Sequence, residues 1–166
     1  DFANERGFMI AGPRVPTKQF VSLFNQNSGV KCFRIPRKLF RSTTSAYVAF
    51  TVACEIAHWS SLSAVIENSE LWQLCCQAQR EIFCLRQHGL VGKLMALVMS
   101  NRRQAKMMRD MERDAAKMGF MNFFHFHHGG KVRQQNILGL ENAVKMGQAQ
   151  GRDMPACLEL LALCNT

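Results

Sequence analysis

Residues 69–88 read SELWQLCCQAQREIFCLRQH, and apolar side chains recur along them at intervals of three and four. Side chains at this spacing share one face of an α-helix, so the stretch predicts an amphipathic helix from Ser69 to His88. Gly89 follows at a position where helices commonly end. The apolar face of this helix consists of Leu71, Leu74, Cys75, Ala78, Ile82 and Leu85.

Helical patterns also flank this stretch on both sides. Ser45–Ile66 is apolar and helix-competent, and Val91–Met118 predicts a third helix with Gly119 at its end. Two shorter helices are predicted at Ile137–Gln148 and Met154–Cys164. Because no run of four or more residues alternates in the manner of a strand, the predicted fold class is all-α, with about five helices in helical hairpins behind an irregular basic arm.

The N-terminal part of the chain is basic and interrupted by prolines. Between Arg6 and Cys54 there are eight basic residues and no acidic one. Pro13, Pro16 and Pro36 lie in this segment, so regular helix is not expected through most of it. Residues 1–43 are therefore predicted to form an extended basic arm, with one short helix near residues 17–25. Residues 44–166 are predicted to form the helical domain, with further chain expected after residue 166 because the apolar pattern is still running there.

Composition and charge limit the kind of partner. The 166 residues include 21 Lys and Arg against 12 Asp and Glu, which gives a formal charge of +9. The length and the 48% hydrophobic content fit one globular domain and exclude collagen and simple disordered polymers. So large a basic excess favours an anionic partner, which is RNA, DNA or an acidic membrane surface.

The seven cysteines do not form a recognisable pattern of pairs. Their number is odd, Cys75 and Cys76 are adjacent, and no C-x-x-C occurs. We therefore interpret them as reduced thiols in an intracellular reducing compartment, with a mitochondrion or another organelle favoured. A zinc ribbon is not expected, because it requires two close pairs of ligands.

One face of the predicted helix Val91–Met118 is strongly cationic, whereas its first part, Leu94–Met99, is apolar all round and is expected to be buried. A row of long cations can follow a phosphate backbone and gain affinity by releasing counterions. The alternative is an ordinary solvated face, on which Asp110, Glu112 and Asp114 pair with basic neighbours. The cationic arc holds Arg102, Lys106, Arg109, Arg113 and Lys117, and Ala105, Met108, Met111, Ala115 and Met118 lie on the other side.

A second basic cluster lies in the predicted arm, where cations are interleaved with apolar and aromatic residues. Basic side chains neutralise phosphates while aromatic faces stack on exposed bases, so the cluster favours a nucleic-acid contact. Two alternatives remain: the aromatic residues fill a groove on another protein, or the segment keeps the composition of an organelle-targeting sequence. The basic residues are Lys31, Arg34, Arg37, Lys38 and Arg41, and the residues between them include Phe33, Ile35, Leu39 and Phe40.

Two groups of residues carry side chains that can bind metal. Glu55 and His58 form one E-x-x-H pair, but a di-iron site needs two such pairs and two further glutamates. His125 and His127 would share a side of an extended segment, with His128 next to them, yet no Cys, Asp or Glu lies nearby in the sequence to complete the site. The simpler interpretations are a buried hydrogen-bonded pair and an aromatic plug whose imidazoles contact carbonyls or phosphates. No metal or cofactor is therefore expected.

Signatures of catalysis are missing from the sequence. It contains no G-x-G-x-x-G, G-x-x-x-x-G-K-[ST], G-x-S-x-G or H-E-x-x-H, so we expect a non-catalytic protein. A metal-dependent enzyme that uses either metal-binding group is kept as an alternative. Ser45–Ile66 is long enough to span a membrane, but Glu55 and His58 lie near its centre, where charge is costly. Burial of this helix against other protein is therefore expected.

Together these features predict an architectural subunit of a large intracellular ribonucleoprotein, such as an organellar (mitochondrial) ribosomal protein. Its basic arm and basic helix face would bind RNA phosphates, and its other surfaces would contact neighbouring protein subunits. One alternative is an accessory subunit of an organellar membrane complex, either respiratory or photosynthetic. A third possibility is a helical viral coat protein, with the cationic helix lining the genomic RNA.

Overall fold

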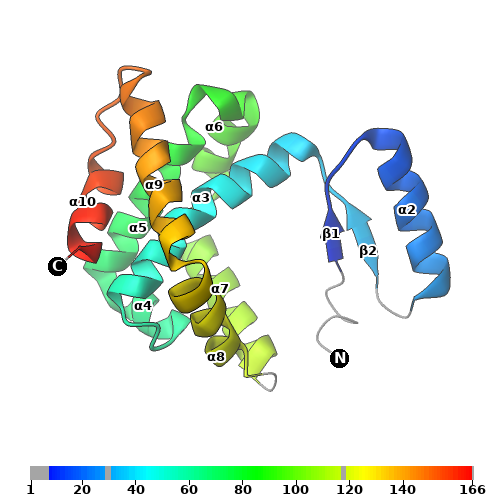
Figure 1. Ribbon diagram of the computed structural model, residues 1–166, viewed down its shortest axis with the longest axis horizontal. Coiled ribbons are helices and arrows are strands. Elements are labelled where there is room, and N and C mark those ends of the chain that lie inside the picture. The colour runs from blue at the N-terminus through cyan, green and yellow to red at the C-terminus, as the bar shows by residue number, and fades with distance from the viewer. Residues whose placement is uncertain (1–7, 29–30, 117–118, 166) are drawn as a thin grey trace. The chain divides into compact units, whose positions relative to one another are not determined.

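The computed structural model describes residues 8–28, 31–116 and 119–165 of the chain (Figure 1). These residues form nine α-helices, labelled α2 to α10, and only two strands of three residues each. The predicted all-α fold class is confirmed. The chain divides into two compact units, an N-terminal unit (Asp1–Arg41) and a helical unit (Ser42–Thr166).

The N-terminal unit is a small β-α-β arrangement rather than an extended arm. Strand β1 (Phe8–Ile10) and strand β2 (Cys32–Arg34) pair in parallel, and helix α2 (Arg14–Asn27) connects them. The side chain of Asn25 holds the start of β2, because its amide donates to the Cys32 carbonyl at 3.0 Å and accepts from the Cys32 N–H at 2.7 Å. The expectation of an irregular arm is therefore wrong for the described part of this segment.

The prolines explain the error, because they lie where a helix tolerates them. Pro13 immediately precedes α2, and Pro16 lies in its first turn, where the missing N–H has no intrahelical partner to lose. Pro36 immediately precedes helix α3 (Arg37–Ile56), which begins earlier than predicted. The short helix predicted near residues 17–25 lies inside α2.

The predicted helix Ser45–Ile66 is two helices in the structure. Helix α3 ends at Ile56, and His58 and Trp59 follow in left-handed conformations with φ of 53° and 54°. The chain then enters helix α4 (Leu62–Glu67), whose N-terminus is capped by the Ser61 hydroxyl accepting from the Ala64 N–H at 2.9 Å.

Helix α5 (Ser69–Phe83) is the centre of the helical unit and confirms the predicted amphipathic helix, with a short 3₁₀ turn (Arg86–His88) after it. It packs against α4, against helix α9 (Arg133–Gln148) and, most extensively, against helix α10 (Pro155–Cys164). Each residue of its predicted apolar face is buried. The core around it also contains Phe50, Cys54, Leu62, Leu140, Cys157 and Leu160.

The predicted helix Val91–Met118 is also interrupted, and it forms helix α6 (Gly89–Val98) and helix α7 (Asn101–Ala115). Ser100 separates them by capping α7, where its hydroxyl accepts from the Arg103 N–H at 3.3 Å. The expected burial of Leu94–Met99 is wrong, because Leu94 is exposed and Leu97 exposes 81% of its surface.

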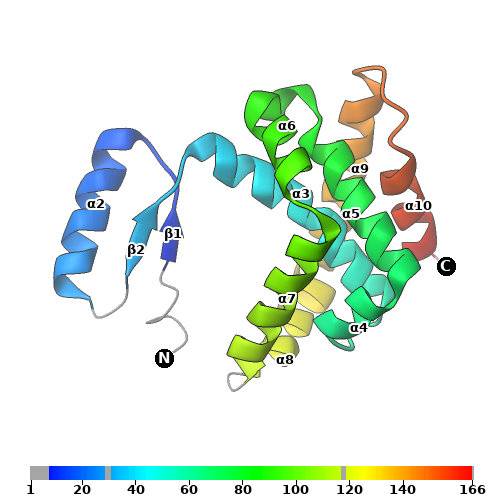
Figure 2. The ribbon, with the colours of Figure 1, turned by 180° about the vertical axis from the view of Figure 1, so that it is seen from behind.

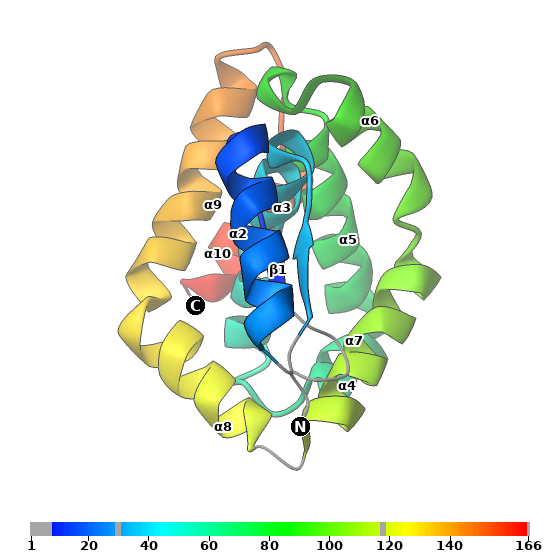
Figure 3. The same cartoon turned by 90° about the vertical axis from the view of Figure 1, so that its right-hand side faces the viewer.

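The aromatic and histidine segment is helical rather than extended. Residues Phe120–Phe124 form helix α8, and His125–Lys131 continue it as a π-helical segment. Figure 3 shows α6 and α7 following one another along one edge of the helical unit, with α9 and α8 along the other. Within the described ranges, no helix is long and apolar enough to cross a membrane.

Candidate nucleic-acid interface

Helix α7 presents the cationic face that its sequence predicts. It lies on the outside of the helical unit and is seen unobstructed in Figure 2. Ala105 and Met108 are buried in the core, and Met111 packs against it from a partly buried position. The opposite side is exposed and carries Arg102, Arg103, Lys106, Arg109 and Arg113. Lys117, predicted on this side, and Met118, predicted on the buried side, lie outside the described residues.

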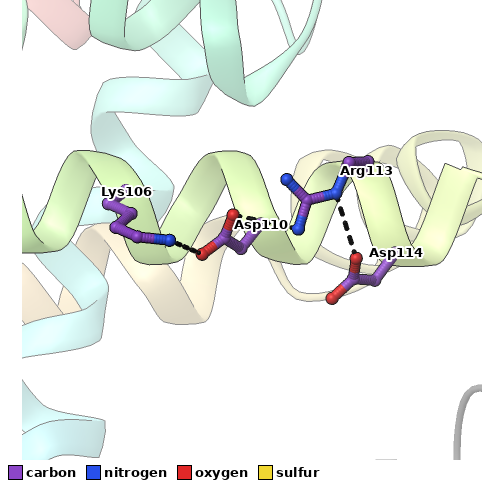
Figure 4. Close-up of polar contacts among 4 residues, drawn as sticks. All are labelled: Lys106, Asp110, Arg113 and Asp114. Atoms are coloured by element: carbon purple, nitrogen blue, oxygen red, sulfur yellow. Dashed lines mark hydrogen bonds and ion pairs between the residues drawn. The ribbon is translucent and has the colours of Figure 1, made fainter.

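Part of this face is neutralised within the helix, as the solvated-face alternative expected (Figure 4). The Asp110 carboxylate accepts from Lys106 Nζ at 2.7 Å and lies 3.0 Å from the Arg113 guanidinium. Arg113 also pairs with Asp114 at 3.3 Å. The hydrogen bond from Lys106 is the main reason why the pKa of Asp110 is lowered, so this carboxylate stays charged at neutral pH.

The remaining cations of α7 keep their charge available. Among the residues that the structure describes, Arg102 and Arg109 have no ion-pair partner, and Arg103 uses its guanidinium only to donate to the Val98 carbonyl at 3.0 Å. Exposed ion pairs such as Lys106–Asp110 are weak, so a phosphate can replace them. The face therefore combines free arginines with easily exchanged pairs.

The third acidic residue of α7, Glu112, does not belong to this face. Its carboxylate accepts from the N–H groups of Leu62 and Ser63 at 2.7 and 3.1 Å, and from the Ser63 hydroxyl at 2.6 Å. Glu112 thus supplies acceptors for the otherwise unsatisfied N–H groups at the start of α4. No sequence pattern indicates this role, because the partners lie about fifty residues away in the chain.

Glu81 has the same function at another helix. Its two carboxylate oxygens accept from the N–H groups of Ala156 and Cys157, at 2.9 and 3.0 Å, at the start of α10. The helical unit thus uses Glu81 and Glu112 to hold helix N-termini. These two carboxylates accept hydrogen bonds from backbone N–H groups, whereas the arginines of α7 face outward.

The predicted basic cluster of the N-terminal unit is divided between two elements. Lys31 and Arg34 lie at the start and end of β2, and Arg37, Lys38 and Arg41 lie in the first two turns of α3. All are exposed except Arg34, which is half-buried. Phe33 and Phe40 are exposed among these cations, as a base-stacking surface requires. Whether they contact RNA stays a prediction.

Glu55 and His58 do not come together as a metal site. Glu55 is instead bound by two donors, because Arg133 Nε and Trp59 Nε1 donate to its two oxygens at 2.7 and 2.6 Å. Partial burial raises the pKa of Glu55, and the two hydrogen bonds lower it. Together with the positive charge of Arg133, the hydrogen bonds outweigh burial, so the net shift of this pKa is downward. His58 is exposed.

The three histidines of the π-helical segment contact aromatic rings and one another. The His125 ring stacks on Trp59 with centroids 5.9 Å apart, and the His127 ring stacks on Phe123 at 5.8 Å. His128 packs edge-on to Phe124, and the Asn136 amide donates to its carbonyl at 3.1 Å. The expectation that His125 and His127 share a side of an extended segment is therefore wrong. Within the described residues no group of three or more metal-binding side chains comes together.

Comparison with known proteins gives no match to a family model, to a curated protein or to a solved structure.

Proposed function

We propose that the protein is a non-catalytic architectural subunit of a large ribonucleoprotein and that it binds RNA phosphates through the exposed face of α7. The observation that carries the proposal is the pair Arg102 and Arg109, which lie about two turns apart on this face without an ion-pair partner among the described residues. Two arginines at this spacing can contact a phosphate backbone through charge alone, and such contacts select no base sequence.

The electrostatics of the whole chain support this proposal. The formal charge is +9, and the stretch from Ile82 to Arg109 contains no Asp or Glu. Glu81, just before this stretch, and Glu112, three residues after it, are turned toward helix N-termini. An excess of outward cations raises the local concentration of a polyanion and steers it to the surface.

The N-terminal unit would supply a second contact through Lys31, Arg34, Arg37, Lys38 and Arg41. Arg34 lies on β2, with Lys31 just before it, and the other three lie on α3. Less conformational entropy is therefore lost on binding than from an extended arm. The same cluster would also suit a neighbouring protein subunit with an acidic surface, and the assignment to an organellar, ribosome-like particle rests on composition.

Charge reversal tests the proposal. The double variant R102E/R109E should weaken binding to a short single-stranded RNA by about tenfold or more, measured by fluorescence anisotropy at low salt. The matched control is K145E/R152E, which changes the net charge equally at exposed positions on and after α9. If both variants weaken binding to the same extent, net charge alone is responsible, and the specific role of α7 is wrong.

Purification of the native particle tests the wider assignment. A structural subunit of a ribonucleoprotein should elute from gentle gel filtration together with RNA and other polypeptides. Elution with a membrane fraction, retained after a carbonate wash and free of RNA, would instead favour the accessory subunit of a membrane complex.

A further inference from the structure

An open depression lies on the surface of α8 and of the π-helical segment that continues it. Its volume is about 610 Å³, which is within the usual range for small-ligand sites. The lining residues are Asn122, His125, Phe126, Gly129, Gly130 and Lys131.

Two glycines line this depression, and they differ in what surrounds them. A Cβ atom at Gly129 would lie 2.5 Å from the His125 ring and 2.6 Å from the Trp59 indole nitrogen, so the backbone packs directly on these rings there. A Cβ atom at Gly130 would meet nothing within 4 Å. Gly130 therefore faces open space, and the depression can be filled at this position without disturbing the core.

The chemistry of the lining residues suits a nucleotide. Phe126 exposes 70% of its surface and offers an unused aromatic face. Lys131 is an exposed cation, and Asn122 carries an amide that can both donate to and accept from the edge of a base. His125 is held in place by its stacking on Trp59. From residue 115 to residue 140 the sequence contains no Asp or Glu that would repel a phosphate.

We propose that this depression binds one unpaired RNA base, which stacks on Phe126 while Lys131 contacts a neighbouring phosphate. Proteins that bind single strands combine aromatic stacking faces with cations in this way, and the faces accept any base. α8 packs against α7, so both proposed sites lie in the helical unit. The site rests on the proposed RNA-binding function and adds to it a preference for single-stranded over duplex RNA.

The test compares three variants on single-stranded RNA that carries 2-aminopurine, a base whose fluorescence falls when it stacks. Phe126→Ala should reduce affinity by about 5- to 150-fold and abolish the fluorescence quenching. Gly130→Gln should have the same effect by filling the depression. Phe123→Ala is the matched control, because this residue is also exposed on the same segment but does not line the depression.

Binding to duplex RNA should be the same for all of these variants, because paired bases cannot enter the depression. If Phe126→Ala and Gly130→Gln bind single-stranded RNA as the unmodified protein does, while R102E/R109E binds weakly, the base site is wrong and the phosphate-binding function stands. If the unmodified protein binds no RNA, both proposals are wrong. A Phe126→Ala variant that loses single-stranded and duplex binding equally would also contradict the base site.

Discussion

Replacement of Glu112 by alanine should destabilise the fold without weakening RNA binding. The carboxylate of Glu112 accepts three hydrogen bonds at the start of α4, from Leu62 N–H, Ser63 N–H and the Ser63 hydroxyl. Glu112→Ala removes both acceptor oxygens and with them all three hydrogen bonds, and Leu62 is fully buried, so its N–H is left without a ready partner. The Ser61 hydroxyl still caps the Ala64 N–H, so part of the helix start survives.

The size of the effect follows from these contacts. A hydrogen bond to a charged group is worth about 1.5–3 kcal/mol, and the loss of an N-cap costs about 0.5–2 kcal/mol. The three bonds share one carboxylate and are not additive, so we expect a total loss of about 2–4 kcal/mol. In a chain of this length 1 kcal/mol corresponds to about 2–4 °C, so the melting temperature should fall by roughly 5–15 °C.

Thermal denaturation followed by circular dichroism measures this shift. Glu159→Ala is the control, because Glu159 is exposed on α10, and its removal should change stability by less than about 0.5 kcal/mol. RNA affinity of Glu112→Ala, measured below its melting temperature, should be at least that of the unmodified protein, since one negative charge is lost. A melting temperature equal to that of the control would refute the capping role. Weaker RNA binding by the folded variant would refute the view that Glu112 lies apart from the cationic face.

Three further predictions concern the helical unit. Gly92→Ala should lower stability by about 1–3 kcal/mol in a urea titration, because its Cβ would meet the Phe83 carbonyl oxygen; an unchanged midpoint would contradict this close approach. Burial lowers the pKa of His128, and a neighbouring imidazole lowers it further, so the unfolded chain binds a proton more readily than the folded one. Stability should therefore fall as the pH drops below about 6.5. The melting temperature of His128→Gln should fall less between about pH 7 and about pH 5 than that of the unmodified protein. Parallel curves of melting temperature against pH would contradict the role of His128. Cys84 and Cys164 are the two cysteines that are not fully buried, so in the native protein only these two should react readily with a thiol reagent. Mass spectrometry identifies the modified residues, and modification of a buried cysteine first would contradict the packing.

The sequence was most informative where an apolar pattern met a clear end signal. The predicted face of α5 is buried as expected, and α9 and α10 lie close to the predicted ranges. The orientation of α7 also follows from spacing alone, because helical periodicity separates Ala105 and Met108 from the arginines. These features depend only on neighbours within one helix, and such local contacts are what a sequence pattern records.

The features that sequence analysis missed depend on particular residues or on distant contacts. Ser61 and Ser100 each interrupt an apolar pattern by capping a new helix. An apolar run does not reveal whether its side chains are covered, so exposed Leu97 could not be distinguished from a core residue. The capping roles of Glu81 and Glu112 join parts of the chain fifty or more residues apart, and no local pattern indicates them.

The three-residue strands of the N-terminal unit were too short to show alternation. Only three pairs define their register, from Phe8 with Cys32 to Ile10 with Arg34. Prolines at the start of a helix and prolines within an irregular arm look alike in sequence. The extended conformation predicted for the basic cluster was therefore wrong, because most of its residues lie on β2 and α3.

The salt dependence of RNA binding tests the role of the α7 cations most directly. For single-stranded RNA each neutralised phosphate contributes about −0.7 to the slope of log Kobs against log salt concentration. Neutralising Arg102 and Arg109 in the variant R102Q/R109Q should therefore make the slope shallower by about 1.4, while K145Q/R152Q should leave it unchanged. Equal slopes for the three proteins, or binding that ignores salt, would contradict the account.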